Sequence, residues 1–289
     1  MGECGESDES GAARVSESLE MESNQALVLI SSGLLSVGLA TIAAGGLAFR
    51  GLSKKTVGDV TKKHSVPWSP GDFLGGGSGG SSPIFGLMWT VIYAWCAVCI
   101  VCTLLAGLGR QNAHSSQTLC WACLFCFLSL LFASFWNIIF VQGKGWSFVA
   151  SSVILFVVTV SMGIAAYLVN PFVHKNMSWF ENVTGLFFAF FFGWTLVAFA
   201  VSLGTVTRFY NRGESRLDED ESSWWPFSLG VLVLVLSCAL TNGFLSVPLL
   251  IASLFFRGYT KRWQVWSSTL LALAGVAVGI VLMLIRRNV

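Results

Sequence analysis

Long runs of apolar residues alternate along the chain with short polar segments. Each run has about 20 residues or more, the length that an α-helix needs to cross the roughly 30 Å hydrocarbon core of a bilayer. A transmembrane barrel would instead show strands of about ten residues with alternating polarity, and that pattern does not occur. The runs predict seven transmembrane helices at residues 24–49, 84–108, 118–141, 146–169, 183–207, 227–256 and 264–285.

The sixth run is longer than one span requires and contains Pro248. Proline removes a backbone hydrogen bond and clashes with the preceding turn of a helix. We therefore expect this helix to be kinked or shortened near Pro248.

The composition indicates a protein whose main solvent is not water. Of its 289 residues, 54% are hydrophobic and only 11% are charged, against roughly 25% charged residues in an ordinary soluble domain. The predicted fold class is all-α, a polytopic membrane helix bundle of about seven transmembrane helices. The expected partner is the lipid bilayer, and nothing in the sequence predicts a nucleic-acid partner.

Polar segments divide the chain into four parts. Residues 1–23 are rich in Glu and Asp and are predicted to be an acidic disordered tail. Residues 24–210 hold the first five helices, with a Gly/Ser-rich loop at 71–82 that is either a flexible connector or a mobile lid over a pocket. Residues 211–226 form a polar loop, and residues 227–289 hold two additional helices and a short basic C-terminus.

Lysine and arginine are distributed unevenly between the two sides of the predicted membrane domain. With seven spans and a non-cytoplasmic N-terminus, eleven of these residues fall on the cytoplasmic side and six on the other. The positive-inside rule therefore favours a non-cytoplasmic N-terminus and a cytoplasmic C-terminus. In this arrangement Arg257, Lys261 and Arg262 lie on the unfavourable side.

Tryptophan-containing motifs follow one another in order along the first five predicted helices. Pro67-Trp68-Ser69-Pro70 is followed, after the Gly/Ser-rich segment, by Phe85-Gly86-x-x-Trp89-Thr90-x-x-Tyr93. Next come Trp136-Asn137-Ile138-Ile139-Phe140 with Gly145-Trp146, and then Gly193-Trp194-Thr195-x-Val197-Ala198. This ordered set resembles the TspO/MBR family, also called tryptophan-rich sensory proteins, over roughly residues 24–210.

The resemblance implies a five-helix bundle, often dimeric, whose tryptophan-lined cavity binds porphyrins, sterols or drug-like aromatic molecules. The chain looks most like members with two additional C-terminal helices. It departs from the family pattern at Ser202, where the family often has Asn, and in the Gly/Ser insertion. We expect Asn137 to give the site its polar contact. The residues expected to line the ligand site are Phe85, Trp89, Tyr93, Trp136, Asn137 and Trp194.

The chemistry of tryptophan is compatible with such a site. Each indole presents a large flat apolar face and one N–H donor, so several together can stack on a planar ligand and orient it. Tryptophans inside helices either line a pocket or pack helices together, and this applies to Trp89, Trp95, Trp136 and Trp194. Those at predicted helix ends are typical of the aromatic belts at membrane interfaces: Trp68, Trp179, Trp224, Trp225 and Trp263.

The end of the fifth predicted helix fits a proposed cholesterol-contact pattern. Val206 is followed by Tyr210 and then by Arg212, which is the order of aliphatic, tyrosine and basic residues in that pattern. The family's sterol-associated segment also closes helix five, so sterol contact at these three residues is one interpretation. The alternative is an ordinary interfacial anchor.

Cysteines recur at three-residue spacing in the second and third predicted helices. Residues three apart share a helix face, and in a simple antiparallel hairpin the two stripes would face each other. Thiolates at this spacing can bind zinc, copper(I) or an iron–sulfur cluster, or can pair as disulfides. Because hydrocarbon disfavours thiolates, we favour packing by small apolar side chains and predict no metal. The expected pairs are Cys96 with Cys126, Cys99 with Cys123, and Cys102 with Cys120.

The predicted spans contain no ionisable side chain of the Asp, Glu, Lys, Arg or His type, and the three histidines lie in loops. This argues against a proton-coupled pump, an ion channel or a haem held by paired histidines. No catalytic motif occurs, so we expect a binding protein rather than an enzyme.

The leading hypothesis is an integral membrane protein that binds, and transports or senses, a hydrophobic planar ligand such as a tetrapyrrole or a sterol, with no required cofactor. The alternatives are a structural subunit of a larger membrane complex or, less favoured, metal or redox handling by the cysteines. A homodimer is compatible with the leading hypothesis.

Overall fold

The computed structural model describes residues 6–52, 60, 83–109, 113, 115–174, 176–212, 225–254 and 262–287. Nearly all of them are helical and none is in a strand, which confirms the all-α class. The Gly/Ser-rich loop and most of the polar loop lie outside the described residues. The elements are α1 (Glu6–Leu52), α3 (Pro83–Leu108), α4 (Ser116–Phe140), α5 (Gly145–Leu168), α6 (Trp179–Arg212), α7 (Trp225–Ala239), the 3-10 helix η1 (Gly243–Ser246), α8 (Val247–Leu254) and α9 (Arg262–Arg287).

Helices α3, α4 and α5 agree with the sequence prediction to within two residues at each end. Their ends have local causes. The Ser115 hydroxyl caps α4 by accepting a hydrogen bond from the Thr118 N–H at 3.3 Å. Gly143, with φ of 62°, reverses the chain after α4. The Lys144 N–H donates to the Ser147 hydroxyl at 3.0 Å at the start of α5.

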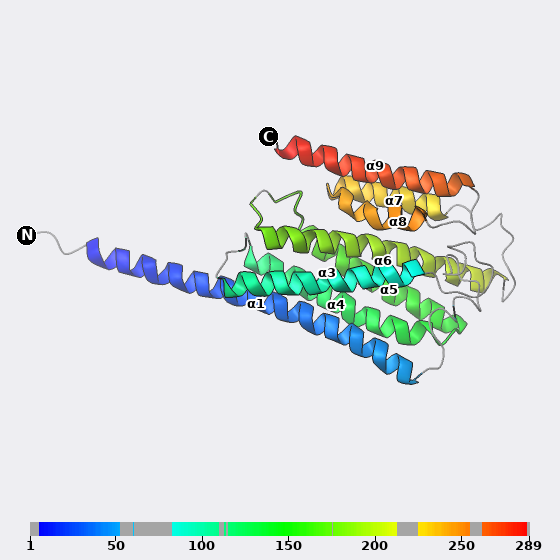
Figure 1. Cartoon of the computed structure of the whole chain (residues 1–289), viewed down its shortest axis with the longest axis horizontal. Helices are drawn as coiled ribbons and strands as arrows, with labels where there is room; N and C mark the ends of the chain where they lie inside the picture. Colours follow the sequence, from blue (N-terminus) through cyan, green and yellow to red (C-terminus); the bar gives the residue numbers. More distant parts are fainter. Residues whose placement is uncertain are drawn as a thin grey trace, which may run out of the picture.

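Helix α1 begins well before its predicted start at residue 24. The helix starts at Glu6, so the prediction of a disordered tail over residues 1–23 is wrong for the part described. This stretch contains no proline, and extending an existing helix avoids the costly nucleation step. Residues 16–23 are helical but mostly exposed, and this part of α1 projects from the bundle (Figure 1).

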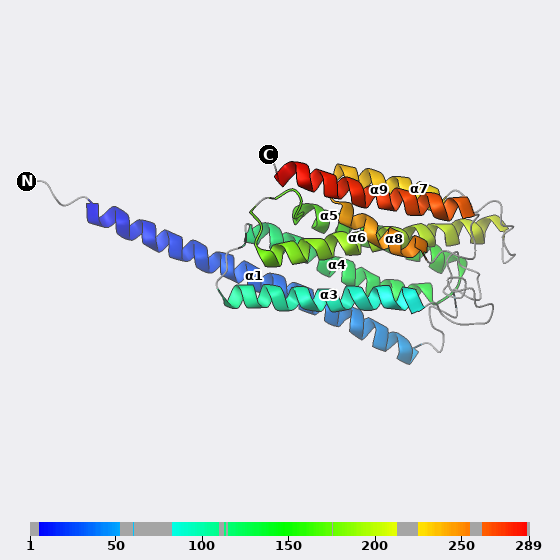
Figure 2. The ribbon, with the colours of Figure 1, turned by 45° about the horizontal axis from the view of Figure 1, so that its top comes forward.

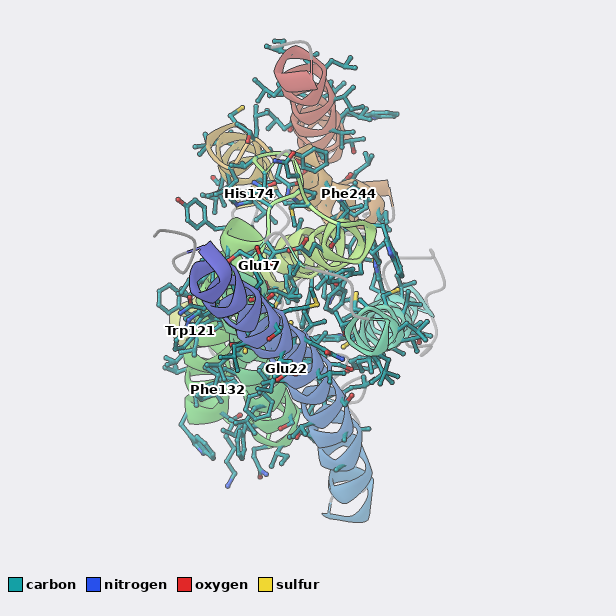
Figure 3. The ribbon with its side chains drawn as sticks, turned by 90° about the vertical axis from the view of Figure 1, so that its left-hand side faces the viewer. Glu17, Glu22, Trp121, Phe132, His174 and Phe244 are labelled. Atoms are coloured by element: carbon teal, nitrogen blue, oxygen red, sulfur yellow. The ribbon has the colours of Figure 1, made fainter. Side chains whose placement is uncertain are left out.

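The first five long helices form a closed ring. Helix α1 packs on α4, α4 on α5, α5 on α6, α6 on α3, and α3 on α1, as the side and end views show (Figures 2 and 3). Hydroxyl groups join neighbouring helices within the ring, as is common in membrane bundles. Ser32 donates to the Ile100 carbonyl, Ser129 to that of Val158, and Thr159 to that of Thr195, at 3.1 to 3.2 Å.

These same five helices are long and apolar enough to cross a membrane. The qualifying segments are Ser16–Gly45, Met88–Leu108, Ser116–Phe140, Gly145–Leu168 and Trp179–Leu203. Large apolar side chains such as Trp121 point outward from the ring (Figure 3), as is expected of a surface that faces lipid. By contrast, α6 is buried around most of its circumference because the C-terminal helices cover its other side.

The sixth apolar run forms a helical hairpin instead of one kinked span. Helix α7 ends at Ala239, the chain turns at residues 240–242, and η1 and α8 follow. Contacts with α9 fix the directions. Along α7, Gly230 lies against Ser268 and Ser237 lies against Gly275, so α7 runs parallel to α9. Along η1 and α8 the order is reversed. Gly243 meets Gly279 and Ser253 bonds Thr269, so α8 runs antiparallel to α9.

This reversal changes the direction expected for the helix that follows it. A single sixth span would make its helix antiparallel to α9, yet α7 and α9 are parallel. The C-terminus therefore lies at the end of the bundle from which α1 projects (Figure 1). Seven full spans are therefore not confirmed, and five helices in the described part of the chain qualify by length and composition.

Two buried asparagines hold the hairpin turn against the end of α5. The Asn170 amide donates to the Leu240 carbonyl at 2.6 Å, and its oxygen accepts from the Phe172 N–H at 3.1 Å and the Asn242 amide at 3.4 Å. Asn242 in turn accepts from the Phe244 N–H at 3.1 Å. Thr241, between the two helices, has a φ of 49°. The turn therefore depends on a residue 70 positions away in sequence.

Replacing Asn170 with leucine is expected to lower the free energy of unfolding by about 1–3 kcal/mol. The substitution leaves the Leu240 carbonyl and the Phe172 N–H buried without this partner. Thermal unfolding in detergent micelles measures the effect. The exposed side chain of Tyr167 on the preceding turn provides the control, because Tyr167→Phe should leave the midpoint unchanged. Equal midpoints for Asn170→Leu and the wild type would contradict the proposed role of the amide.

Candidate functional site

Helices α3 and α6 bring three of the expected ligand residues together. Trp89 and Tyr93 lie one turn apart on α3 with ring centroids 5.7 Å apart. Across the interface Trp89 meets Trp194 edge-on at 6.4 Å and Phe191 at 6.1 Å. Edge-to-face pairs at this separation are a favoured aromatic geometry. Trp194 is fully buried, whereas Trp89 and Tyr93 retain partial exposure.

A second group of aromatic rings extends this cluster toward the hairpin. Trp95 on α3 contacts Phe187 and Phe190 on α6, and it also contacts Phe244 on η1 at 5.8 Å. Phe244 is labelled in the end view (Figure 3). Sequence reasoning missed these phenylalanines as site neighbours. The signal was present in the run Phe187-Phe188-Ala189-Phe190-Phe191-Phe192, which directly precedes the Gly193-Trp194 motif.

Trp136 lies elsewhere in the bundle. Its ring stacks on Phe140 at 5.1 Å, and Phe140 contacts Phe148 of α5 at 5.6 Å, so Trp136 belongs to the α4–α5 interface. Asn137, the next residue, is half-buried. No ring contact among the described residues joins Trp136 to Trp89 or Trp194. The structure thus divides the expected site into two groups, and the role of Asn137 as a polar contact stays a prediction.

Three of the remaining expected residues lie outside the described side chains. Phe85, Tyr210 and Arg212 fall within α3 and α6, but their side chains are not described. Val206 is partly buried and packs against the core. Sterol contact at Val206, Tyr210 and Arg212 therefore stays a prediction.

Ser202, which replaces the asparagine common in the resembled family, has a defined partner. Its hydroxyl is 2.7 Å from that of Ser152 on α5, and both residues are buried. This bond ties α5 to α6 near the end of the bundle where α6 finishes. Interhelical hydroxyl bonds of this kind contribute on average about 0.6 kcal/mol in membrane bundles.

The expected direct hairpin of the two cysteine-bearing helices is wrong. Helix α1 packs on both α3 and α4, which do not pack along each other. Glycines permit both contacts: on α1, Gly38 receives the Leu130 side chain and Gly45 that of Ser134 of α4, and on α3, Gly107 receives Leu29 of α1. Across the interior Cys96 lies near Cys126, and Cys99 lies near Cys123.

The neighbours of the cysteines are hydroxyl groups. Thr184 of α6 lies next to Cys99, and Ser31 of α1 lies next to Cys120 and Cys123. The seven cysteines in the described part of the chain are free thiols. No group of three or more His, Cys, Asp or Glu side chains there could hold a metal ion. The metal interpretation and the expectation of no metal both stay predictions.

A buried carboxylate escaped the sequence analysis because α6 begins at Trp179, earlier than predicted. Glu181, in the first turn, is 3% exposed. Its Oε2 accepts hydrogen bonds from the Ser178 N–H at 2.8 Å and the Ser178 hydroxyl at 2.7 Å. Its Oε1 accepts a longer bond from the Ser115 N–H at 3.5 Å. A negative charge is favourable at a helix N-terminus, so Glu181 caps α6. It also links the residue before α6, Ser178, to the residue before α4, Ser115.

Comparison with protein-family models gave no match, and neither did comparison with curated proteins or with solved structures. The resemblance to the TspO/MBR family therefore rests on the tryptophan motifs and stays a prediction. What the structure establishes is the class of protein: a helical bundle with five helices long and apolar enough to span a membrane.

Proposed function

We propose that this protein binds a hydrophobic planar ligand, such as a tetrapyrrole or a sterol, inside the ring of five membrane helices. The observation that carries the proposal is the cluster of Trp89, Tyr93, Phe191 and Trp194 between α3 and α6. These rings offer apolar faces with few polar atoms, which suits recognition by stacking. The five-helix ring also agrees with the bundle that the resemblance implies.

Titration with protoporphyrin IX tests the proposal. Binding next to the indole rings should quench tryptophan fluorescence with saturation, because the bound porphyrin absorbs close to the emitting side chains. The Trp89→Ala/Trp194→Ala variant removes two of the stacking surfaces and should weaken binding by at least tenfold. A change of this size corresponds to about 1.4 kcal/mol.

The control is a second double variant, Trp121→Ala/Trp146→Ala. Both of these side chains are about half exposed on the outer surface of the ring, so their removal should leave the affinity unchanged. A linear, non-saturating response that is the same in the wild type and the Trp89/Trp194 variant would refute specific binding.

A role as a subunit of a larger complex is the second candidate function. The N-terminal part of α1 favours it, because this part projects beyond the bundle (Figure 1) and exposes Glu17 and Glu22 (Figure 3). A helix with no packing partner is a natural docking element for a basic surface. Purification in mild detergent with a stoichiometric partner protein, together with no saturable porphyrin binding, would favour this candidate over the first.

We also propose an orientation in which both termini lie on the non-cytoplasmic side. With α7 parallel to α9, the connections after α1, α4, α6 and α8 all share one side of the membrane. Arg257, Lys261 and Arg262 then join the basic side, which removes the exception in the seven-span arrangement. Because lysine and arginine concentrate on the cytoplasmic side, these connections face the cytoplasm.

A further inference from the structure

Two fully buried polar atoms at the α4–α5 interface have no hydrogen-bond partner. They are the indole Nε1 of Trp136 and the hydroxyl of Ser151. Trp136 is 7% exposed and Ser151 is 0% exposed. Nearby hydroxyls on α5 are satisfied: Ser147 bonds the Lys144 backbone, and Ser152 bonds Ser202. Trp136 and Ser151 therefore differ from the neighbouring hydroxyl groups of Ser147 and Ser152, which have hydrogen-bond partners.

The two atoms come from facing positions at one level of the bundle. Ser129 of α4 donates to the Val158 carbonyl of α5 at 3.2 Å, which fixes the register of this antiparallel pair. Seven residues onward from Ser129 is Trp136, and seven residues back from Val158 is Ser151. Seven residues are about two helical turns, so Trp136 shares the helix face of Ser129 and Ser151 shares that of Val158. The ring contact of Phe140 with Phe148 agrees with this register.

Leaving such groups unpaired is costly. A buried donor or hydroxyl without a partner costs about 1–3 kcal/mol, and no water from a hydrocarbon environment compensates it. Buried polar groups of native proteins are almost always satisfied. One oxygen atom between the helices would satisfy both, because it can accept the indole N–H and can also pair with the hydroxyl.

We propose that Trp136 and Ser151 hold a neutral hydroxyl or carbonyl oxygen at one end of the hydrophobic ligand, a proposal that rests on the proposed function above. A carboxylate is disfavoured, because no described cationic side chain is buried at this level and an unpaired buried charge is expensive.

The bond between Ser152 and Ser202 places Ser151 level with residue 203 of α6. Trp194 is nine residues before that position, or roughly 13 Å along the helix. The ligand class is therefore an elongated apolar molecule whose body lies against Trp89 and Trp194 and whose oxygen is terminal, as in a sterol alcohol.

A matched pair of sterols tests this assignment. Cholestanol and cholestane have the same saturated ring skeleton and differ only in the hydroxyl group, which cholestane lacks. Each is measured as a competitor of a fluorescent sterol bound to the full chain in detergent. Wild-type protein should bind cholestanol about 2- to 10-fold more tightly than cholestane, which is the net value of one or two hydrogen bonds. In Trp136→Phe and Ser151→Ala this ratio should fall to about one.

The control variant is Ser152→Ala, which removes a buried hydroxyl that already has a partner and should leave the ratio unchanged. If Trp136→Phe does not fold, Ser151→Ala carries the test. Saturable binding of both sterols with equal affinity, or a ratio unaffected by Ser151→Ala, would mean that an ordered water or a direct Trp136–Ser151 bond satisfies the pair. Protoporphyrin binding without sterol binding would overturn this assignment alone, whereas no saturable binding of any of these ligands would overturn the proposed function as well.

Discussion

Replacement of Gly279 by alanine is expected to destabilise the C-terminal helices by about 1–3 kcal/mol or more, because a methyl group there meets backbone atoms. Gly243 on the hairpin turn lies directly against the Gly275-x-x-x-Gly279 face of α9. A methyl group on Gly243 would stand 2.6 Å from the Gly275 carbonyl oxygen and 2.8 Å from the Gly279 Cα. Small residues at this spacing let two membrane helices approach closely.

The neighbouring contacts leave little room for relaxation. Gly193 of α6 lies against the Leu245 carbonyl oxygen and Pro248 on the opposite side of the turn. The turn is thus held between α6 and α9, and it cannot move away from a new side chain on α9 without disturbing α6. Backbone atoms cannot rotate aside as a flexible side chain would, so the expected cost exceeds the helix-propensity gain of about 1 kcal/mol from glycine to alanine.

Gly33 gives the matched control. It lies within helix α1, and a methyl group there would meet no atom within 4 Å. Gly33→Ala should therefore be neutral or stabilise by up to about 1 kcal/mol. Unfolding in detergent, followed by circular dichroism, measures both variants. Equal midpoints for Gly279→Ala and Gly33→Ala would show that the turn does not dock on α9 as described.

The positions of most helices could be predicted because bilayer thickness sets their length and their apolar composition sets their environment. The hairpin escaped this interpretation because the run is apolar on average, although Thr241-Asn242-Gly243 interrupts it and the Asn-Gly pair is a local turn signal. Pro248 correctly marked the run as irregular, but the reversal itself comes eight residues earlier, near Leu240. It depends on Asn170, a partner on another element that no local pattern reveals.

The candidate site was predictable to the extent that its residues share one helix. Trp89 and Tyr93 are four residues apart, so their common face follows from helix geometry. Which helices meet is a matter of packing, and here the sequence interpretation failed. Gly38 and Gly45 of α1 let that helix approach α4, and Gly107 of α3 receives Leu29 of α1. Helix α1 therefore packs on both cysteine-bearing helices, which do not form a direct hairpin. Trp136 belongs to the α4–α5 interface through Phe140 and Phe148, and no ring contact among the described residues joins it to the indoles with which it was grouped.

We expect the C-terminus to lie on the same side of the membrane as the N-terminus. In the proposed orientation twelve of the 17 lysines and arginines share the cytoplasmic side, compared with eleven in the seven-span arrangement. Arg257, Lys261 and Arg262 move to the cytoplasmic side in the proposed orientation, whereas Arg286 and Arg287 move to the other side. The twelve are Arg50, Lys54, Lys55, Lys62, Lys63, Lys144, Arg208, Arg212, Arg216, Arg257, Lys261 and Arg262.

Short epitope tags placed before Met1, between residues 255 and 261, and after Val289 distinguish the two arrangements in sealed membrane vesicles. The hairpin requires the two terminal tags to be cleaved by protease from the same side, and the internal tag only from the other side. A single sixth span would instead place the internal tag with the N-terminal tag and would protect the C-terminal tag when the N-terminal one is cleaved. Because each tag is either accessible or protected, the result does not depend on a small energy difference. The control is cleavage of all three tags after the vesicles are opened with detergent.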